Sequence, residues 1–233
     1  MVRLFSALAA ILIGAGTAQA ECRLALVLAL DVSASVDEGE YRLQRDGLAA
    51  ALDRPEIRQA ILTGAPGHVA LSVFEWSGRY HQHVALEWMA LTDTAAIDQA
   101  VARLASVTRS YSNMPTAVGY ALGYSSGLLR RGPDCARQVV DLSGDGINNE
   151  GFGPELAYRN FPFDGVTVNG LVIEGRNREL VTFYDQEVLR GPDAFLELAS
   201  GFDEFAEAMA RKLYRELGGL SVGALEDETR APG

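Results

Sequence analysis

The sequence predicts an α/β fold with a doubly wound, mainly parallel sheet of six strands, one of them antiparallel at the edge, flanked by helices. The first observation is the unbroken aliphatic run at residues 24–30, which ends at Asp31 and is typical of a strand covered on both faces. The second is a predicted strand at residues 137–142, which leads into a turn that holds Asp145 between two glycines. The third is the alternation of apolar runs with segments of helical periodicity, which is the order of a parallel sheet wound by helices.

Six segments are predicted to be helical, and local signals mark where several of them begin or end. Acidic residues within positions 37–40 suit the amino end of the first helix, and Pro55 interrupts it. Asp93 can cap the third helix. In the last helix, apolar residues recur at every fourth position from Phe205 to Leu217. The expected helices cover residues 37–53, 56–63, 95–107, 116–130, 155–160 and 203–217.

The other strands of the predicted sheet are short apolar runs bounded by turns. Only the turn at residues 77–79 separates the second run from the third, which favours an antiparallel hairpin. Residues 174–193 have no clear period, so we expect an irregular insertion there, with a buried patch at Phe183 and Tyr184. The expected strands after the first one cover residues 69–76, 80–88, 137–142, 166–173 and 194–199.

The composition is that of one exported globular domain. With 233 residues, of which 48% are hydrophobic, the chain can form a sizeable core. A formal net charge of −11 argues against nucleic acid or an anionic membrane surface as the main partner. A signal peptide is predicted from Arg3, a short apolar run and a small-x-small pattern. The alternative is an uncleaved membrane anchor. No later stretch resembles a transmembrane helix. The expected parts are a signal peptide at 1–20, one domain at 21–217 and a flexible tail at 218–233.

The chain has two cysteines, Cys22 and Cys135. Cys22 lies nine residues before Asp31, and Cys135 lies ten residues before Asp145. If the two strands that end at these acids are parallel neighbours, both cysteines lie at the edge of the sheet opposite the acids. An exported chain is found where disulfides persist, so we expect a Cys22–Cys135 bridge, with two separate thiols as the alternative.

Oxygen-bearing side chains lie at the predicted carboxyl ends of two strands, where open α/β sheets bind ligands. Asp31, Ser33 and Ser35 follow the first strand, and Asp145 follows the fourth. Thr116 comes from the start of the helix that precedes the fourth strand. Carboxylate and hydroxyl oxygens are hard donors, which suit Mg²⁺, Mn²⁺ or Ca²⁺. Taken one at a time, each residue could instead form a polar turn or a helix cap.

Together these residues resemble the von Willebrand factor A (vWA) domain and its metal-ion-dependent adhesion site (MIDAS). The family pattern is Asp-x-Ser-x-Ser, then a distant Thr, then a distant Asp usually followed by Gly. Gly144 stands where the family often has Thr or Ser. The resemblance covers residues 23–217 and is closest to an exported bacterial branch of uncharacterised function. The matching residues are Asp31, Ser33, Ser35, Thr116 and Asp145.

The resemblance implies a Rossmann-like vWA fold and a way for this site to work. Ser33, Ser35 and Thr116 would bind a divalent cation through neutral hydroxyls. Asp31 and Asp145 would bind it directly or hold its waters. The ion keeps one open position, which an Asp or Glu carboxylate of a partner protein can fill. The resemblance thus implies a periplasmic or secreted protein-binding module rather than an enzyme.

Two other functions remain open. A metal-assisted hydrolase or phosphoryl-transfer enzyme could also place an Asp and Mg²⁺ at the edge of a sheet. However, no second carboxylate stands two residues after Asp31, and the sequence has no Gly-x-Ser-x-Gly motif. A scaffold domain without a working metal site is the other alternative, although the intact Asp-x-Ser-x-Ser motif argues against it.

Overall fold

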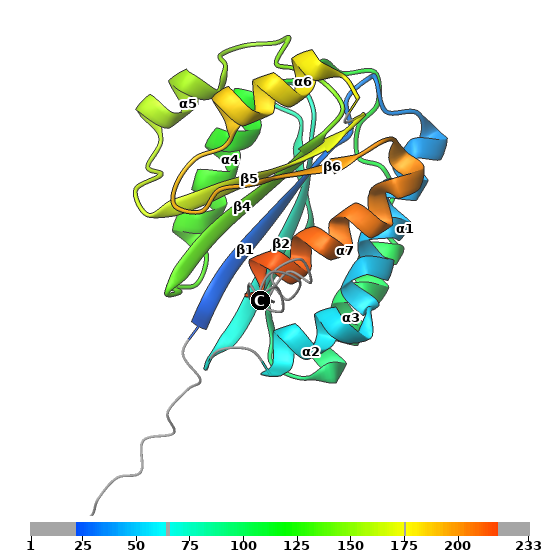
Figure 1. Ribbon diagram of the computed structural model, residues 1–233, viewed down its shortest axis with the longest axis vertical. Coiled ribbons are helices and arrows are strands. Elements are labelled where there is room, and N and C mark those ends of the chain that lie inside the picture. Colours follow the sequence, from blue (N-terminus) through cyan, green and yellow to red (C-terminus); the bar gives the residue numbers. More distant parts are fainter. Residues whose placement is uncertain (1–21, 64–65, 175, 219–233) are drawn as a thin grey trace, which may run out of the picture.

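The computed structural model describes residues 22–63, 66–174 and 176–218, so the expected signal peptide and residues 219–233 of the expected tail lie outside the described residues. The described chain forms a six-stranded sheet in the order β3-β2-β1-β4-β5-β6 (Figure 1). The strands are β1 (Cys22–Asp31), β2 (His68–Trp76), β3 (Gln82–Leu91), β4 (Arg137–Gly144), β5 (Val166–Ile173) and β6 (Leu196–Ala199).

All neighbouring strands are parallel except β2 and β3, which are antiparallel. The strand β3 lies at the edge, as the hairpin prediction requires. The sheet order places β1 and β4 side by side in the centre, so the segments that follow both strands emerge at the same edge of the sheet. The predicted fold class is therefore confirmed.

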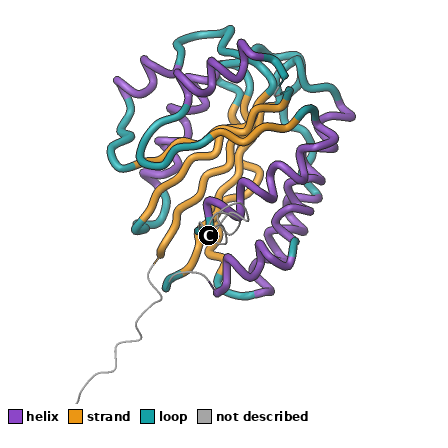
Figure 2. Tube along the Cα trace, viewed as in Figure 1, coloured by secondary structure: helices purple, strands orange, loops and turns teal. Residues whose placement is uncertain are grey.

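Helices cover both faces of the sheet (Figure 2). Every residue of β1 is buried, because its side chains point alternately to the two faces of the sheet and helices cover both faces. Leu24, Leu26 and Leu28 pack in a core with α1, α2, α3 and α7, whereas Ala25 and Val27 pack in a second core with α4, α5 and α6. The helices are α1 (Glu38–Asp53), α2 (Pro55–Thr63), α3 (Thr94–Ala105), α4 (Val118–Arg131), α5 (Pro154–Asn160), α6 (Arg178–Phe183) and α7 (Phe205–Glu216).

The first and third helices both begin at an Asp cap, of which the sequence predicts the one at Asp93. The Asp37 side chain accepts a hydrogen bond from the Glu40 backbone N–H, and the Glu40 side chain accepts one from the Asp37 backbone N–H, which completes a capping box for α1. The Asp93 side chain accepts a hydrogen bond from the Ala96 backbone at the start of α3. Within the described residues, no helix has both the length and the apolar character needed to cross a membrane.

Three of the differences between the structure and the sequence prediction concern α4, β3 and the segment before β6. The helix α4 begins at Val118 rather than at residue 116, and Ala117 is its cap residue. The strand β3 begins at Gln82 because His81 closes a turn with Ser77 and Gly78 through backbone hydrogen bonds. The expected irregular insertion at 174–193 instead forms α6, a π-helix (Tyr184–Val188) and a chain that leads into β6.

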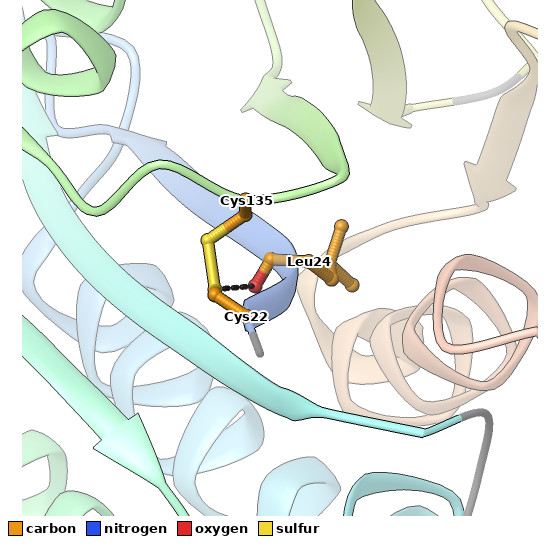
Figure 3. Close-up of a disulfide and its surroundings, with 3 residues drawn as sticks. All are labelled: Cys22, Leu24 and Cys135. Atoms are coloured by element: carbon orange, nitrogen blue, oxygen red, sulfur yellow. Dashed lines mark hydrogen bonds between the residues drawn. A yellow bond between two sulfur atoms is a disulfide. The ribbon is translucent and has the colours of Figure 1, made fainter. Parts of the chain in front are cut away.

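Cys22 and Cys135 form the predicted disulfide, with their Cα atoms 4.5 Å apart (Figure 3). Cys22 is the first residue of β1, and Cys135 lies just before β4. Both lie at the edge of the sheet where these strands begin, opposite the edge that carries Asp31 and Asp145. The bridge thus ties together the far ends of the two strands that lead to the candidate site.

A cluster of buried charges joins α7 to the sheet. Lys212 of α7 is completely buried, and its Nζ lies 3.0 Å from Glu216 Oε1 and 3.3 Å from Asp141 Oδ1. Asn169 of β5 donates a hydrogen bond to the same Glu216 oxygen, at 2.9 Å. The pKa of Asp141 is raised to about 8, mainly by burial; Lys212 opposes this effect, and the charge of Glu216 adds to it.

Because of this cluster, the free energy of unfolding is expected to fall as pH rises. The folded protein holds a proton on Asp141 that the unfolded chain, with the usual pKa of 3.8, releases. The stability that this proton contributes is fully present below pH 3.8 and is lost as pH rises towards 8. We expect Asp141→Asn to flatten the fall in the free energy of unfolding between pH 5 and pH 9, measured by urea denaturation. The exposed control Asp164→Asn should keep the slope of the parent protein; a parent-like slope in Asp141→Asn would contradict the prediction.

Candidate metal centre

The structure brings the predicted site residues together from three separate segments of the chain. Asp31 is the last residue of β1, and Ser33 and Ser35 lie in the loop that follows. Asp145 directly follows β4. Thr116 lies in the loop before α4, not in its first turn, and makes no cap for that helix. The prediction that these side chains share one edge of the sheet is therefore correct, whereas the predicted position of Thr116 within the helix is wrong.

Hydrogen bonds link all of these residues. Asp31 Oδ1 accepts from the backbone N–H of Ser33, at 2.8 Å. Thr116 Oγ1 donates to Ser33 Oγ at 3.2 Å, and the Oγ atoms of Ser33 and Ser35 lie 3.1 Å apart. Ser35 Oγ donates to Asp145 Oδ1 at 2.7 Å. The three hydroxyls therefore form a chain that ends on Asp145, and the backbone of Ser33 joins this chain to Asp31.

Burial and the neighbouring negative charge make ionisation of the two carboxylates unfavourable. Asp31 is completely buried, and among the described residues its Oδ2 has no hydrogen-bond partner. Burial, followed by the charge of Asp145, raises the pKa of Asp31 to about 8. Burial also raises the pKa of Asp145, although the hydrogen bond from Ser35 opposes this. A divalent cation between the two groups would reverse both effects, because it stabilises the ionised carboxylates.

The donors present here suit a hard cation. Two carboxylates and three hydroxyls offer oxygen ligands only, which Mg²⁺, Mn²⁺ and Ca²⁺ prefer. In the part of the chain that the structure describes, no three His, Cys, Asp or Glu side chains gather as a metal cluster. The candidate site would therefore depend on its hydroxyls. Ser35 is exposed and Asp145 is half-buried, so this side of the site faces solvent.

Arg109 fixes the loop that carries the two serines, a role that the sequence does not indicate. Its Nη2 lies 3.0 Å from Val32 O, 3.1 Å from Ser33 O and 2.7 Å from Val36 O. Its Nε donates to the carbonyl of Tyr111, at 2.7 Å. The guanidinium group therefore donates to several backbone carbonyls of the loop at once. A single Arg in a polar loop gives no sequence signal for this role.

A buried acid of β2 holds the segment that contains Arg109. Glu75 is almost completely buried, and its carboxylate accepts from Tyr41 Oη at 2.6 Å and from the backbone N–H of Ser110 at 2.8 Å. Ala34 N also donates to the carbonyl of Met114, at 2.7 Å. The serine loop and the segment before Thr116 are therefore joined directly. Glu75 gave no signal because it interrupts an otherwise apolar strand only once.

The loop after β4 fixes Thr116. Asn149 Oδ1 accepts from Thr116 N at 2.8 Å, and Asn149 N donates to Thr116 O at 2.9 Å. Asn148 Oδ1 accepts from Gly119 N at 3.3 Å, near the start of α4. These contacts hold Thr116 outside the helix, with its hydroxyl directed at Ser33. They also join two of the three segments that supply the candidate ligands.

Comparisons with solved structures identify the fold. Proximal thread matrix protein 1 from the mussel byssus has 16% identity and a TM-score of 0.61, over 86% of this chain and 49% of that one. A structure of the same protein with a zinc-occupied MIDAS motif has 17% identity and a TM-score of 0.56, with the same coverage. A von Willebrand factor type A structure from Catenulispora acidiphila has 16% identity and a TM-score of 0.57, over 85% of this chain and 43% of that one. At this level of identity, the similarity establishes the fold alone.

The chain spans about half the length of the first solved structures that it matches, or less. The pilus adhesin SpaC from Lactobacillus rhamnosus GG is longer still: the match covers 86% of this chain but 31% of SpaC, at 14% identity and a TM-score of 0.55. No curated protein matches the sequence. The family model for a protein of unknown function, DUF1194, matches residues 21–221. Because this match covers most of the sequence, the chain belongs to the DUF1194 family, here with the fold of a vWA domain.

Proposed function

We propose that the chain is an exported, metal-dependent protein-binding module with a site of the MIDAS type. Ser33, Ser35 and Thr116 bind Mg²⁺, or Mn²⁺ or Ca²⁺, through their hydroxyls. Asp31 and Asp145 bind the ion directly or hold its waters. A carboxylate of an Asp or Glu on a partner protein completes the coordination of the ion on the side that faces solvent. This function involves no chemical turnover.

One observation carries the proposal: Asp31 keeps a buried carboxylate oxygen without a partner among the described residues, at the centre of a hydroxyl network drawn from three segments. An unpaired buried oxygen is costly unless another group compensates for it. A set of unrelated turns and caps does not account for this arrangement, because Thr116 and Ser35 direct their hydroxyls at Ser33 and Asp145 instead of at the ends of helices. A cation at this position compensates for the unpaired oxygen.

The fold neighbours support the same function. One of them carries a zinc-occupied MIDAS motif, and another is a pilus adhesin. For this chain we propose residues 1–20 as an export signal, 21–217 as the binding domain and 218–233 as a tail. The disulfide supports a periplasmic or extracellular location, because such bridges persist in oxidising compartments.

Titration with Mn²⁺ and Mg²⁺ in a calorimeter tests the metal site. We expect the wild-type chain to bind one ion, and Asp31→Ala to lose more affinity than the roughly 10–100-fold that loss of an outer hydrogen-bond partner costs. Asp164→Ala is the matched control, because Asp164 is exposed in the turn before β5. No binding by the wild-type chain would favour the scaffold alternative instead.

A pull-down from the exporting cell, run with Mg²⁺ and again with EDTA, tests the partner. The bound protein should be lost in EDTA and with Asp31→Ala, and retained with Asp164→Ala. Capture that persists in EDTA would contradict a metal-bridged contact. Metal-dependent turnover of a panel of esters or phosphates would favour the hydrolase alternative.

A further inference from the structure

Tyr184 is a buried tyrosine whose hydroxyl lacks a partner. It is the first residue of the π-helix and has an exposed fraction of 0%. Its side chain packs in the second core, with residues of β4 and β5. Among the described residues, its Oη has no hydrogen-bond partner. Buried tyrosine hydroxyls usually have one, and π-helical turns are often found at functional sites.

Two glycines make room for this side chain on adjacent strands. A Cβ atom at Gly170 of β5 would lie 2.8 Å from Tyr184 Cδ1, and one at Gly144 of β4 would lie 2.7 Å from Tyr184 Oη. The strands are neighbours, with Leu142 paired to Gly170 two residues before Gly144. Any larger residue at either glycine would collide with the tyrosine. The two glycines therefore let Tyr184 reach across β5 and β4 towards β1.

The Tyr184 hydroxyl ends beside the unpaired oxygen of the candidate metal site. The same Cβ position at Gly144 would lie 3.0 Å from Asp31 Oδ2. Tyr184 Oη and Asp31 Oδ2 thus lie within 3.0 Å of one point, and both are buried and without partners among the described residues. A phenol donates a hydrogen bond and an ionised carboxylate accepts one, so the two groups are complementary.

We propose that Tyr184 is a positioning residue for the metal centre. Its hydroxyl donates a hydrogen bond to Asp31 Oδ2 when the site holds its cation. This bond orients the carboxylate while Oδ1 stays on the Ser33 backbone, and the remaining lone pairs serve the ion or its waters. The inference rests on the proposed metal-binding function. The position of Tyr184 also explains why residue 144 is a glycine, because a Ser or Thr there would overlap the tyrosine oxygen.

The test compares Tyr184→Phe with Tyr158→Phe, by titration with Mn²⁺ and by thermal unfolding in EDTA. Tyr158 is the matched control, since its hydroxyl donates to the carbonyl of Val188 at the other end of the π-helix. We expect Tyr184→Phe to weaken Mn²⁺ binding about 10–100-fold, in the range found for outer-shell partners. Its melting temperature in EDTA should be no lower than that of the wild-type chain, because the lost hydroxyl is unpaired there. A residue with a merely structural role would lower the melting temperature with or without metal.

A rescue variant tests the geometry directly. Gly144→Ser alone should weaken Mn²⁺ binding, because the new side chain meets Tyr184 Oη. In combination with Tyr184→Phe, the serine no longer meets the tyrosine oxygen and brings a hydroxyl next to Asp31, so Mn²⁺ affinity should recover. Unchanged Mn²⁺ binding by Tyr184→Phe, or an equal loss in Tyr158→Phe, would overturn the inference and leave the proposed function intact. Absence of Mn²⁺ binding by the wild-type chain would overturn both.

Discussion

Replacing Lys212 with Met is expected to lower the free energy of unfolding by about 3–5 kcal/mol, because the change leaves a buried carboxylate without its cation. Lys212 has no exposed surface and lies within 3.3 Å of both Asp141 and Glu216. Met keeps most of the side-chain volume, so little packing is lost. Urea denaturation at pH 7, followed by circular dichroism, measures the effect.

Two further variants separate charge from packing. Arg211→Met removes the neighbouring cation, which pairs with Glu197 at 2.6 Å on the surface, and should cost less than about 1 kcal/mol. Lys212→Met combined with Glu216→Gln removes both charges of the buried pair and should recover part of the lost stability. If Lys212→Met unfolded at the same urea concentration as Arg211→Met, the buried ion pair would contribute nothing measurable to the fold.

Removal of the Cys22–Cys135 bridge is expected to cost up to about 4–5 kcal/mol, which is the chain-entropy value for a closed loop of this size. The bridge spans 113 residues, so the unfolded chain gains a large number of conformations when it is opened. The native state changes little, because Ala136 N still donates to Cys22 O, at 2.9 Å. The urea midpoint of a variant with both cysteines changed to Ala measures the loss.

Reductant provides the control for this prediction. It should lower the urea midpoint of the wild-type chain towards that of the double variant and leave the double variant unchanged. Replacement of one cysteine alone should give nearly the same loss as replacement of both. A wild-type midpoint that does not respond to reductant, with the bridge shown to be open by mass spectrometry, would contradict a stabilising role.

The sequence predicts the central strands well because their signals are local and strong. Residues 24–30 are buried on both faces, and such a run is typical of a strand between two layers of helices. The hairpin of β2 and β3 and the helix caps at Asp37 and Asp93 depend on neighbouring residues, so they too can be recognised. The candidate site could be predicted because the carboxyl ends of parallel strands share one edge.

What could not be predicted depends on contacts between distant segments. Thr116 lies outside α4 because Asn149 binds its backbone on both sides, and no local pattern encodes that contact. Arg109 binds carbonyls more than 70 residues away in the sequence. The π-helix has no characteristic apolar period, which is why Tyr184 was expected only to be part of a buried patch. Gly144 could be noted as a departure from the family pattern, but its reason required the position of Tyr184.

Both ends of the described chain leave the domain at the pole opposite the candidate site. Arg23, next to the disulfide at the start of β1, donates a hydrogen bond to the carbonyl of Leu217 just after α7. About 30 Å of strand separates this pole from Asp31, at roughly 3.3 Å per residue. If the domain is attached at either end to a surface, a dye or a further domain, the loop with Ser33 and Ser35 therefore stays exposed. The same geometry suits insertion of the domain into a longer polypeptide, because its entry and exit points are adjacent and its recognition edge stays unobstructed.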